Sequence, residues 1–541
     1  MAGSALRRSR PRRSTPGAAW PAVLPEPTDA KQKGSPVSPD AVIVGTGPNG
    51  LAAGVTLARA GLSVELYEAA PAIGGGLRTE SLFDSDVVHD ICSAVHPMAV
   101  ASPFFKAFDL TARNVEMLHA PASYAHPLTD TVAAIAYRDL VTTCTGLGPD
   151  GPRWQRLMEP LLEHSDAVVE LLLSGPGAFP RDLAAPLLLA RRILAHGTRL
   201  HAGQFATPQA RALLTGVAAH SVGPLPSLAA GTVAMLLGHL AHKGGWPVPR
   251  GGSSTIAAAM ADDITVHGGI FHTGCMISDL RELPPAKAIL LDISPAALPR
   301  ITAGRLPRPY QRALARFRYG PGAAKADFLL SEPVPWTNPN IGRATTVHLG
   351  GTRTQILRSE NATAAGMLAK EPFVLVVDPA VADPGRARPG KRPLWAYAHV
   401  PNGDITDPVE LITARIEKYA PGFRSTVIAH RGISAARYEA YNPNYVGGDI
   451  GTGAVTLRQS LFRPVPRMSP HRVPLPGVYL CSAATPPGPG VHGMSGYRAA
   501  LEALRHEFDI RRPPLLGVDS AAPGTPRGSR PRRATSGPAF R

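Results

Sequence analysis

The sequence has few of the features that define metal-binding, disulfide-linked or membrane-spanning proteins. It has four cysteines in 541 residues, and none forms a C-x-x-C pair or has metal-ligand spacing: Cys92, Cys144, Cys275 and Cys481. This pattern argues against a structural zinc site and a thioredoxin-type redox pair, and it is typical of a reducing compartment. No apolar run reaches the roughly 18–20 residues of a membrane span. We therefore expect a cytoplasmic protein that holds no metal.

Charge is also scarce, because only 18% of the residues are Asp, Glu, Lys or Arg. Residues 1–38 carry a net charge of +5 and residues 511–541 carry +6, so the two ends hold most of the total of +16. Basic tails can bind nucleic acid or anionic lipid. These two segments lack apolar periodicity, so we predict disordered basic tails and no specific nucleic-acid partner.

A strand–turn–helix–strand pattern opens the remaining chain. Residues 41–44 predict a buried strand, residues 51–59 a helix and residues 64–68 a second strand. The turn after the first strand is glycine-rich, and Glu68 lies 23 residues after its first glycine. Such a turn lets backbone N–H groups approach a pyrophosphate at a helix N-terminus, while the acid accepts ribose hydroxyls. The predicted contacts are Gly45, Gly47, Pro48, Asn49, Gly50 and Glu68.

Further along, the chain alternates between helical and strand-rich regions. Residues 157–173, 183–194 and 210–242 have helical patterns, whereas residues 264–293 and about 324–440 have strand patterns. The second strand-rich region predicts an antiparallel sheet, with strands at 373–377 and 394–398. Near the end, residues 477–481 predict a strand and residues 496–508 a helix. This strand–loop–helix pattern resembles the strand–turn–helix unit at residues 41–68. We therefore expect segments that are distant in sequence to complete the first domain.

A second glycine-rich turn follows Glu68 directly, at Gly74-Gly75-Gly76-Leu77-Arg78-Thr79. This arrangement resembles flavoproteins of the glutathione-reductase-like, amine-oxidase superfamily. Four further motifs resemble the phytoene-desaturase-like family, in the branch that contains pyridine nucleotide-disulphide oxidoreductase domain-containing protein 2. They are residues 93–97 (SAVHP), 245–252 (GWPVPRGG), 444–450 (NYVGGDI) and 489–494 (PGVHGM). The resemblance covers residues 40–510, although the chain lacks a disulphide pair.

The resemblance implies an α/β fold, in which a Rossmann-type FAD-binding domain holds an inserted substrate domain with a mixed sheet and helices. The FAD-binding domain would be assembled from residues 39–120, 244–300 and 471–510. Residues 121–243 would form a helical cap, and residues 301–470 the substrate domain. Residues 1–38 and 511–541 stay outside it as tails. The implied cofactor is FAD.

Site residues follow from the same resemblance. Further cofactor contacts are expected at Gly75, Gly76, Arg78, Met276, Val491, Gly493 and Met494. His96 and His492 are the titratable residues expected nearest the flavin, as catalytic groups or as imidazoles that hold their loops. Asp449 could orient the substrate loop or cap a turn. The sequence departs from the family pattern at Ser482, where the family commonly has glycine. A serine there could weaken a close contact between the backbone and the cofactor.

The preferred function is FAD-dependent dehydrogenation of a small apolar, isoprenoid-like substrate by hydride transfer to the flavin. Two alternatives stay open. A flavin amine oxidase would need an aromatic cage, for which Tyr438, Tyr441 and Tyr445 are candidates. A scaffold protein could bind FAD without turnover, since no unmistakable catalytic acid or base stands out. Residues 187–194 form a basic amphipathic stretch, which predicts either a peripheral membrane contact or a partly exposed helix. The sequence leaves the oligomeric state open.

Overall fold

The computed structural model describes residues 38–84, 86–174, 182–199 and 203–518. The chain divides after Ser38, and residues 39–541 form one unit. Its first sheet is parallel throughout and has the order β16-β10-β1-β2-β9. The strands are β1 (Ala41–Val44), β2 (Val64–Tyr67), β9 (Ile270–His272), β10 (Ala288–Leu291) and β16 (Val478–Leu480). Three separated segments therefore build one parallel sheet, and the predicted α/β Rossmann-type fold is confirmed.

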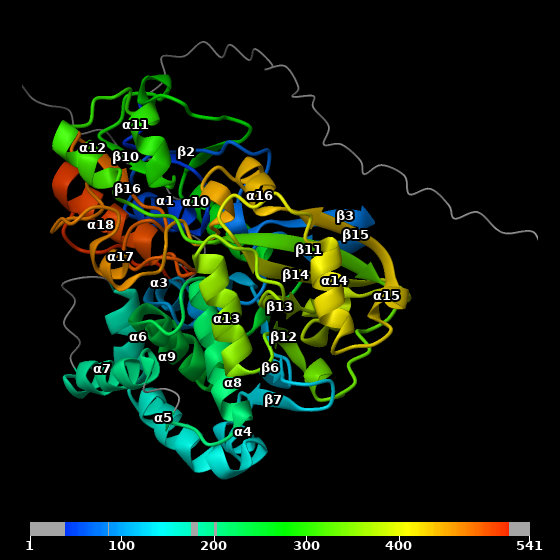
Figure 1. The fold of residues 1–541 in the computed structure, drawn as a ribbon. Coiled ribbons are helices and arrows are strands. Elements are labelled where there is room, and N and C mark those ends of the chain that lie inside the picture. The colour runs from blue at the N-terminus through cyan, green and yellow to red at the C-terminus, as the bar shows by residue number, and fades with distance from the viewer. Residues whose placement is uncertain (1–37, 85, 175–181, 200–202, 519–541) are drawn as a thin grey trace, which may run out of the picture. The chain divides into compact units, whose positions relative to one another are not determined.

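Alternating side chains of β1 cover the two faces of this sheet. Ala41 and Ile43 enter the core formed with α1 (Pro48–Arg59), α10 (Ser254–Val266) and α18 (Met494–Glu507). Val42 and Val44 enter a second core with α11 (Leu298–Ile301) and α12 (Arg308–Leu314). Both helical layers are visible beside the parallel strands in Figure 1. The sheet is thus buried on both sides, as parallel sheets require.

Three predicted boundaries are corrected by the structure. The first helix begins at Pro48 rather than at Leu51, because the fixed φ of proline suits a first helical turn. The strand pattern over 264–293 was too broad, since α10 occupies residues up to Val266. The predicted C-terminal tail began at 511, yet Leu516 is 3% exposed and packs into the first core. Residues 1–37 and 519–541 of the predicted tails lie outside the described residues.

The second sheet has seven strands in the order β15-β11-β14-β13-β12-β6-β7, antiparallel except between β12 and β6. The strands are β6 (Ala122–Pro127), β7 (Ala133–Tyr137), β11 (Gly322–Leu330), β12 (Ala344–Leu349), β13 (Val374–Val377), β14 (Arg392–Val400) and β15 (Val427–Ile433). Val374 and Val376 pack toward α14 (Val409–Glu417), whereas Leu375 and Val377 face a cavity. Two strands come from residues 121–243, a region predicted as helical.

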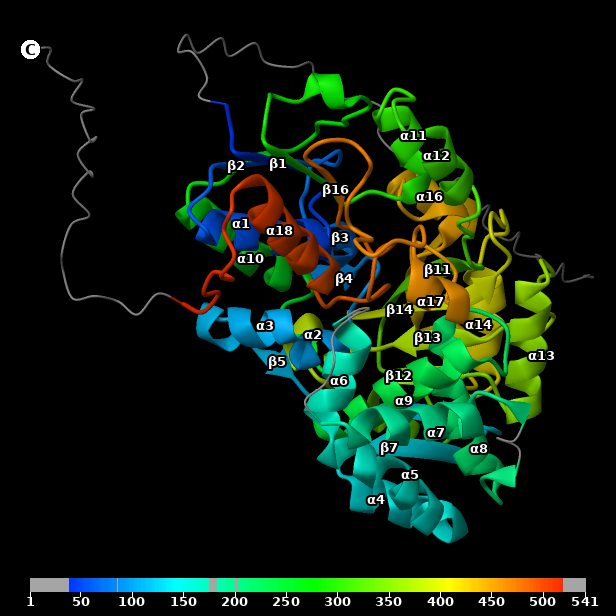
Figure 2. The same ribbon diagram turned by 90° about the vertical axis from the view of Figure 1, so that its left-hand side faces the viewer.

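A group of helices lies along the β6–β7 side of the second sheet, as Figure 2 shows. It comprises α4 (Leu140–Gly146), α5 (Gly151–Glu163), α6 (Ser165–Leu173), α7 (Ala184–His196), α8 (Pro208–Ala218) and α9 (Leu228–Lys243). The remaining elements include β3 (Thr79–Asp84), β4 (Val87–Asp90), β5 (Met117–Leu118), β8 (Val248–Pro249), α2 (Pro97–Ala101), α3 (Pro103–Phe108), α13 (Arg353–Ala364), α15 (Phe423–Thr426), α16 (Ala435–Tyr441) and α17 (Leu457–Phe462). None of the helices in the described parts of the chain combines the length and apolar character that a bilayer crossing requires.

Candidate functional site

One cavity of about 850 Å³ joins the parallel sheet to the second sheet and the helices. Its polar end is lined by the glycine-rich turn after β1, together with Glu68 and Arg78. Its apolar part is lined by side chains of α6, α7, α9 and the second sheet, among them Leu172, Leu189, Ile193, Leu236, Leu237, Leu375 and Val377. This volume is within the range of small-molecule and cofactor sites. The arrangement offers a nucleotide cradle and an apolar chamber in one continuous space.

The cradle is built from glycines that could not carry a side chain. Gly45 has a φ of +94°, and an added Cβ would lie 2.7 Å from the Asp292 carbonyl oxygen. A Cβ on Gly75, at φ +54°, would lie 2.9 Å from the Gly47 Cα. The Asn49 side chain is 3% exposed, and its Oδ1 atom has no hydrogen-bond partner among the described residues. Close backbone and a helix N-terminus suit a dinucleotide pyrophosphate, whereas the Asn49 Oδ1 could only accept a hydrogen bond.

Glu68 follows β2 at the wall of this cradle, where its carboxylate is already well held. One oxygen accepts from the Thr46 backbone N–H at 2.9 Å and from the Thr46 hydroxyl at 2.5 Å. The other accepts from the Ala70 N–H and from Arg78 Nη2, both at 3.0 Å. The carboxylate is therefore fixed at the cavity wall, where ribose hydroxyls of an adenosine could reach it. Its contact with a ribose stays a prediction.

Asp292 is the main site residue that the sequence reasoning missed. It follows β10 and faces the turn, where its Oδ2 accepts the Gly50 N–H at 2.9 Å. Burial raises the pKa of Asp292 to about 7, and the nearby Glu68 charge adds to the shift. Asn444, from a motif that carried the family resemblance, donates to the Asp292 carbonyl oxygen at 3.0 Å. An acid at the end of a strand was the only signal, and only the pairing of β1 with β10 places it here.

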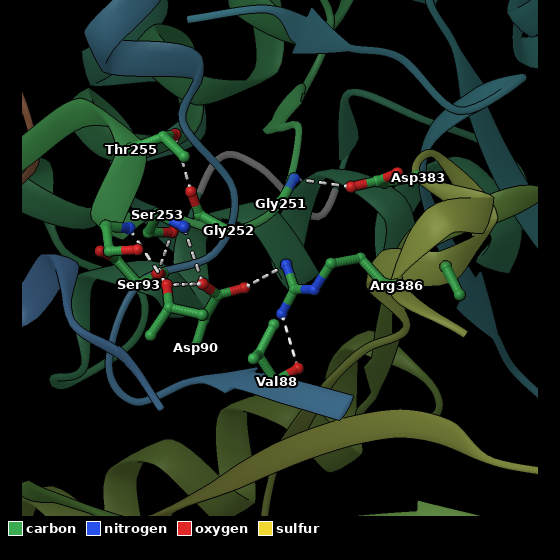
Figure 3. Close-up of polar contacts among 12 residues, drawn as sticks. Val88, Asp90, Ser93, Gly251, Gly252, Ser253, Thr255, Asp383 and Arg386 are labelled. Carbon is green, nitrogen blue, oxygen red and sulfur yellow. Dashed lines mark hydrogen bonds and ion pairs between the residues drawn. The ribbon is translucent and has the colours of Figure 1, made fainter. Parts of the chain in front are cut away.

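Asp90 organises the polar contacts that connect two of the motifs, as Figure 3 shows. Its Oδ1 accepts from the Ser253 N–H at 2.8 Å and from the Thr79 hydroxyl at 2.7 Å. Its Oδ2 accepts from Arg386 Nη1 at 3.0 Å. Burial raises the pKa of this carboxyl, but the Arg386 charge and these hydrogen bonds outweigh burial and hold it below the ordinary value. The ionised carboxylate therefore ties β4 to the start of α10.

His96 is oriented by this network through Ser253. The Ser253 hydroxyl donates to the Ser93 carbonyl at 2.6 Å, so its oxygen can accept from His96 Nε2 at 2.8 Å. His96 Nδ1 is then unprotonated, and it has no hydrogen-bond partner within the described ranges. Burial lowers the pKa of His96 to about 4, with partial compensation from Asp90. His96 lines the cavity as a neutral imidazole with one free lone pair.

His492 is placed differently, because both of its ring nitrogens bind its own loop. Nδ1 accepts the Met494 N–H at 3.0 Å, so Nε2 carries the proton and donates to the Gly488 carbonyl at 3.0 Å. Burial lowers the pKa of His492 to about 4. Val491 beside it lines the cavity, whereas the His492 side chain is fully buried behind the wall. The geometry favours the loop-shaping role over the catalytic role for this residue.

The other predicted residues fall into two groups. Gly47, Pro48, Gly76, Met276 and Ser482 line the cavity, and Met276 is also 52% exposed on the loop after β9. Gly50, Gly493 and Met494 do not line the cavity and are closely packed, and their contact with the cofactor stays a prediction. A Cβ on Gly50 would collide with the Gly45 carbonyl, one on Gly493 would lie 2.7 Å from Phe104, and Met494 belongs to the first core.

The predicted tyrosine cage does not converge on the cavity. Tyr445 lines it, but the Tyr438 hydroxyl donates to the Ile91 carbonyl and the Tyr441 hydroxyl donates to Glu80. A different aromatic pair lines the cavity from β14, where Trp395 and Tyr397 stack with their centroids 5.8 Å apart. Their i, i+2 spacing puts both on one face of the strand, which is the signal that could have found them.

A buried histidine cluster beside the chamber was also missed. His220 lines the cavity, and its Nε2 lies 2.9 Å from Nε2 of His348 on β12. His126 on β6 packs edge-on against His348, with centroids 6.2 Å apart. Burial lowers the pKa of His220 to about 3 and keeps that of His348 well below the usual range. These imidazoles are neutral at physiological pH, and widely separated sequence positions gave no signal of the cluster.

Comparisons with known proteins agree with this architecture. Residues 43–109 match the NAD(P)-binding Rossmann-like domain family. The chain is 24% identical to pyridine nucleotide-disulfide oxidoreductase domain-containing protein 2 of Rattus norvegicus, over 93% of this chain and 99% of that protein. Among solved structures, an oxidoreductase from Methanosarcina mazei is similar with a TM-score of 0.58 at 15% identity, over 85% of this chain and 99% of that one. Putrescine oxidase is similar with a TM-score of 0.56 at 16% identity, over 86% and 99%.

These similarities confirm the predicted resemblance and fold class. They also confirm the expectation of an oxidoreductase that has a Rossmann-like dinucleotide-binding domain. The structural likenesses, at 15–16% identity, speak for the fold alone. Identity of the cofactor as FAD, the substrate and the roles of the site residues stay predictions.

The raised pKa of Asp292 predicts a specific pH dependence of stability. Because the folded state keeps this carboxyl protonated up to about pH 7 and the unfolded chain ionises near 3.8, the folded state binds more protons in that window. The free energy of unfolding should therefore decrease as the pH rises between these two values, by at most about 1.4 kcal/mol per pH unit. Asp292→Asn should lack this slope. Urea unfolding of both proteins from pH 4.5 to 8 tests it, and a pH-independent difference between them would contradict the assignment.

Proposed function

We propose that the protein is an FAD-dependent oxidoreductase that dehydrogenates an apolar substrate. The observation that carries this proposal is the continuity of one cavity from the glycine cradle to the apolar chamber. The cradle suits the diphosphate of a dinucleotide, and the chamber suits a hydrocarbon-rich molecule. A bound FAD would supply the two-electron acceptor that takes a hydride from the substrate.

Removal of two hydrogens from a substrate also releases a proton, which needs an acceptor. Among the predicted residues, we assign this role to His96, because the residue lines the cavity and its buried Nδ1 is unprotonated and has no hydrogen-bond partner within the described ranges. Asp90 and Ser253 hold the imidazole by the contacts described above and so act as positioning residues. The leucine-rich chamber excludes water from the reacting carbon, which protects reactive intermediates.

Amine oxidation is the second candidate function, and the stacked Trp395–Tyr397 pair is the observation that favours it. Aromatic faces could bracket a neutral amine beside the acceptor. Anaerobic mixing with primary amines or with unsaturated hydrocarbons separates the two functions by which class bleaches the flavin. A protein that binds FAD yet is reduced by neither class would instead support the scaffold alternative.

Glu68 provides the test of the cofactor. Glu68→Ala should weaken FAD binding about tenfold or more, because charge-assisted hydrogen bonds to a ribose contribute roughly 1.5–3 kcal/mol. Fluorescence titration of the apoprotein with FAD measures the dissociation constant. Glu65→Ala is the matched control, since Glu65 lies on β2, just before Glu68, and forms hydrogen bonds with Tyr67 and His272. Equal affinity of wild type and Glu68→Ala would remove Glu68 from the FAD site.

Substitutions of the two histidines are expected to have different effects on the rate of flavin reduction. His96→Asn should retain FAD and slow flavin reduction by about 10²–10⁴, as expected for loss of a proton acceptor. With a pKa of about 4, His96 is neutral above that value, so the wild-type rate should fall only at acid pH. His492→Asn should slow reduction only modestly, because its nitrogens bind backbone. Rapid-mixing measurements across pH test both variants, and a larger loss in His492→Asn than in His96→Asn would reverse the assignment.

We further propose that an apolar substrate enters from a lipid surface near α7. Leu189 and Ile193 of this helix line the cavity, while Leu183, directly before the helix, and Leu187 within it are 79% and 77% exposed. Arg191 is exposed beside them, whereas Arg192 donates to α5 carbonyls. Leu187→Glu should reduce flotation with phosphatidylglycerol vesicles severalfold, since it puts a charge into the proposed contact. Val266→Glu is the control at an equally exposed position (79%), and absence of wild-type flotation would refute the membrane contact.

A further inference from the structure

Arg463 is a buried cation on the wall of the cavity. Its side chain is 2% exposed, and the residue follows α17 directly. Nη2 donates to the Gly453 carbonyl at 3.0 Å, while Nε has no hydrogen-bond partner in the described part of the chain. Within those same residues no carboxylate lies within 4.0 Å of its nitrogens. The guanidinium therefore has only a neutral carbonyl partner.

Two glycines make the space that this guanidinium occupies. Gly453 has a φ of +127°, and an added Cβ would lie 2.7 Å from Arg463 Nη2. Gly488 has a φ of +116°, and its added Cβ would collide with Nη1. Both positions also have backbone conformations that side chains rarely adopt. The absence of side chains at these two glycines leaves room for the guanidinium and, at Gly453, also for the Phe317 ring, with which the added Cβ would collide.

The nearest acid, Asp449, raises the pKa of Arg463 through its charge, but these two described residues form no salt bridge. Asp449 accepts the N–H groups of Gly320 at 2.7 Å and of Gly451 and Gly453 at 2.9 Å, so its oxygens serve the backbone. Burial also raises the pKa of Asp449, which disfavours its ionised form. Burial lowers the pKa of Arg463 to about 10, so the guanidinium is still charged at physiological pH. Buried charges are normally paired, because unpaired ones are costly.

We propose that Arg463 binds the carboxylate of an otherwise apolar substrate. The proposal rests on the proposed function and names the class of its substrate: a carboxylic acid with a long hydrocarbon part. A guanidinium donates charge-assisted hydrogen bonds to a carboxylate, here from the nitrogens that do not bind the Gly453 carbonyl, and the leucine-rich chamber accommodates the hydrocarbon. A cofactor pyrophosphate is a poorer partner, because the contacts of Arg463 are with Gly453 and Gly488 and not with the glycine-rich turn.

Calorimetric binding of two probes of equal chain length tests the proposal on the purified full-length protein. Decanoate carries the carboxylate and 1-decanol does not. At pH 7.5, decanoate should bind the wild type about tenfold or more tightly than 1-decanol, and Arg463→Gln should abolish that difference. Arg463→Lys should keep part of it, because the charge remains. Arg458→Gln is the matched control, since Arg458 is exposed on α17 and makes the same charge change.

Equal binding of the two probes to the wild type would overturn the proposal without any variant. An unchanged preference for decanoate in Arg463→Gln would also overturn it. A changed flavin reduction potential in Arg463→Gln, with decanoate binding unaltered, would assign the arginine to the cofactor instead. Because calorimetry does not depend on flavin reduction, failure of the proposed redox function would be seen separately, as absent FAD or absent bleaching.

Discussion

The turn between β1 and α1 packs closely against backbone from three other parts of the chain. Gly45 meets the end of β10 at Asp292, and Gly47 meets the second glycine-rich turn at Gly75. Gly496 in α18 lies so near the Asn49 carbonyl that any Cβ there would collide with it. Side chains at these positions would force the sheet and the helices apart. The positions of the glycine-rich turn, of α1 and of α18 therefore all depend on these close backbone contacts.

The rest of the cavity is positioned from that point by buried polar contacts. Asn444 binds the end of β10, and the segment that follows it carries Asp449 and Gly453 to the opposite wall. Asp90 performs the equivalent task on the other side, where it connects β4 to α10 and, through Ser253, orients His96. The contacts of Asn444 and of Asp90 with Ser253 are made to backbone, whereas His96 is held by the Ser253 hydroxyl; buried polar groups generally need such partners. Residues of these motifs thus connect separate elements of the fold and also line the candidate site.

The titratable groups on the cavity wall differ in whether burial removes their charge. Burial keeps the imidazoles of His96 and His220 neutral and makes the carboxyl of Asp292 harder to ionise. Arg463 is different, because even when buried its guanidinium stays charged at physiological pH. Away from the Glu68–Arg78 pair at the polar end, a buried positive charge in a mostly apolar space favours ligands that carry a negative charge.

The sequence by itself determined the parts that depend on near neighbours. The strand, the glycine-rich turn and Glu68 lie within thirty residues, so their spacing alone predicted the cradle and the parallel fold. Only the tertiary structure decided which residues meet across the cavity. Asp292, His220 and Arg463 come from distant segments. Pairing of β1 with β10 brings Asp292 to the site. His220 follows α8 and Arg463 follows α17, so the packing of these helices places them at the cavity. The same distance explains why two strands of the second sheet were missed within a region of helices. Local patterns encode turns and periodicity, whereas long-range pairing depends on how whole elements pack.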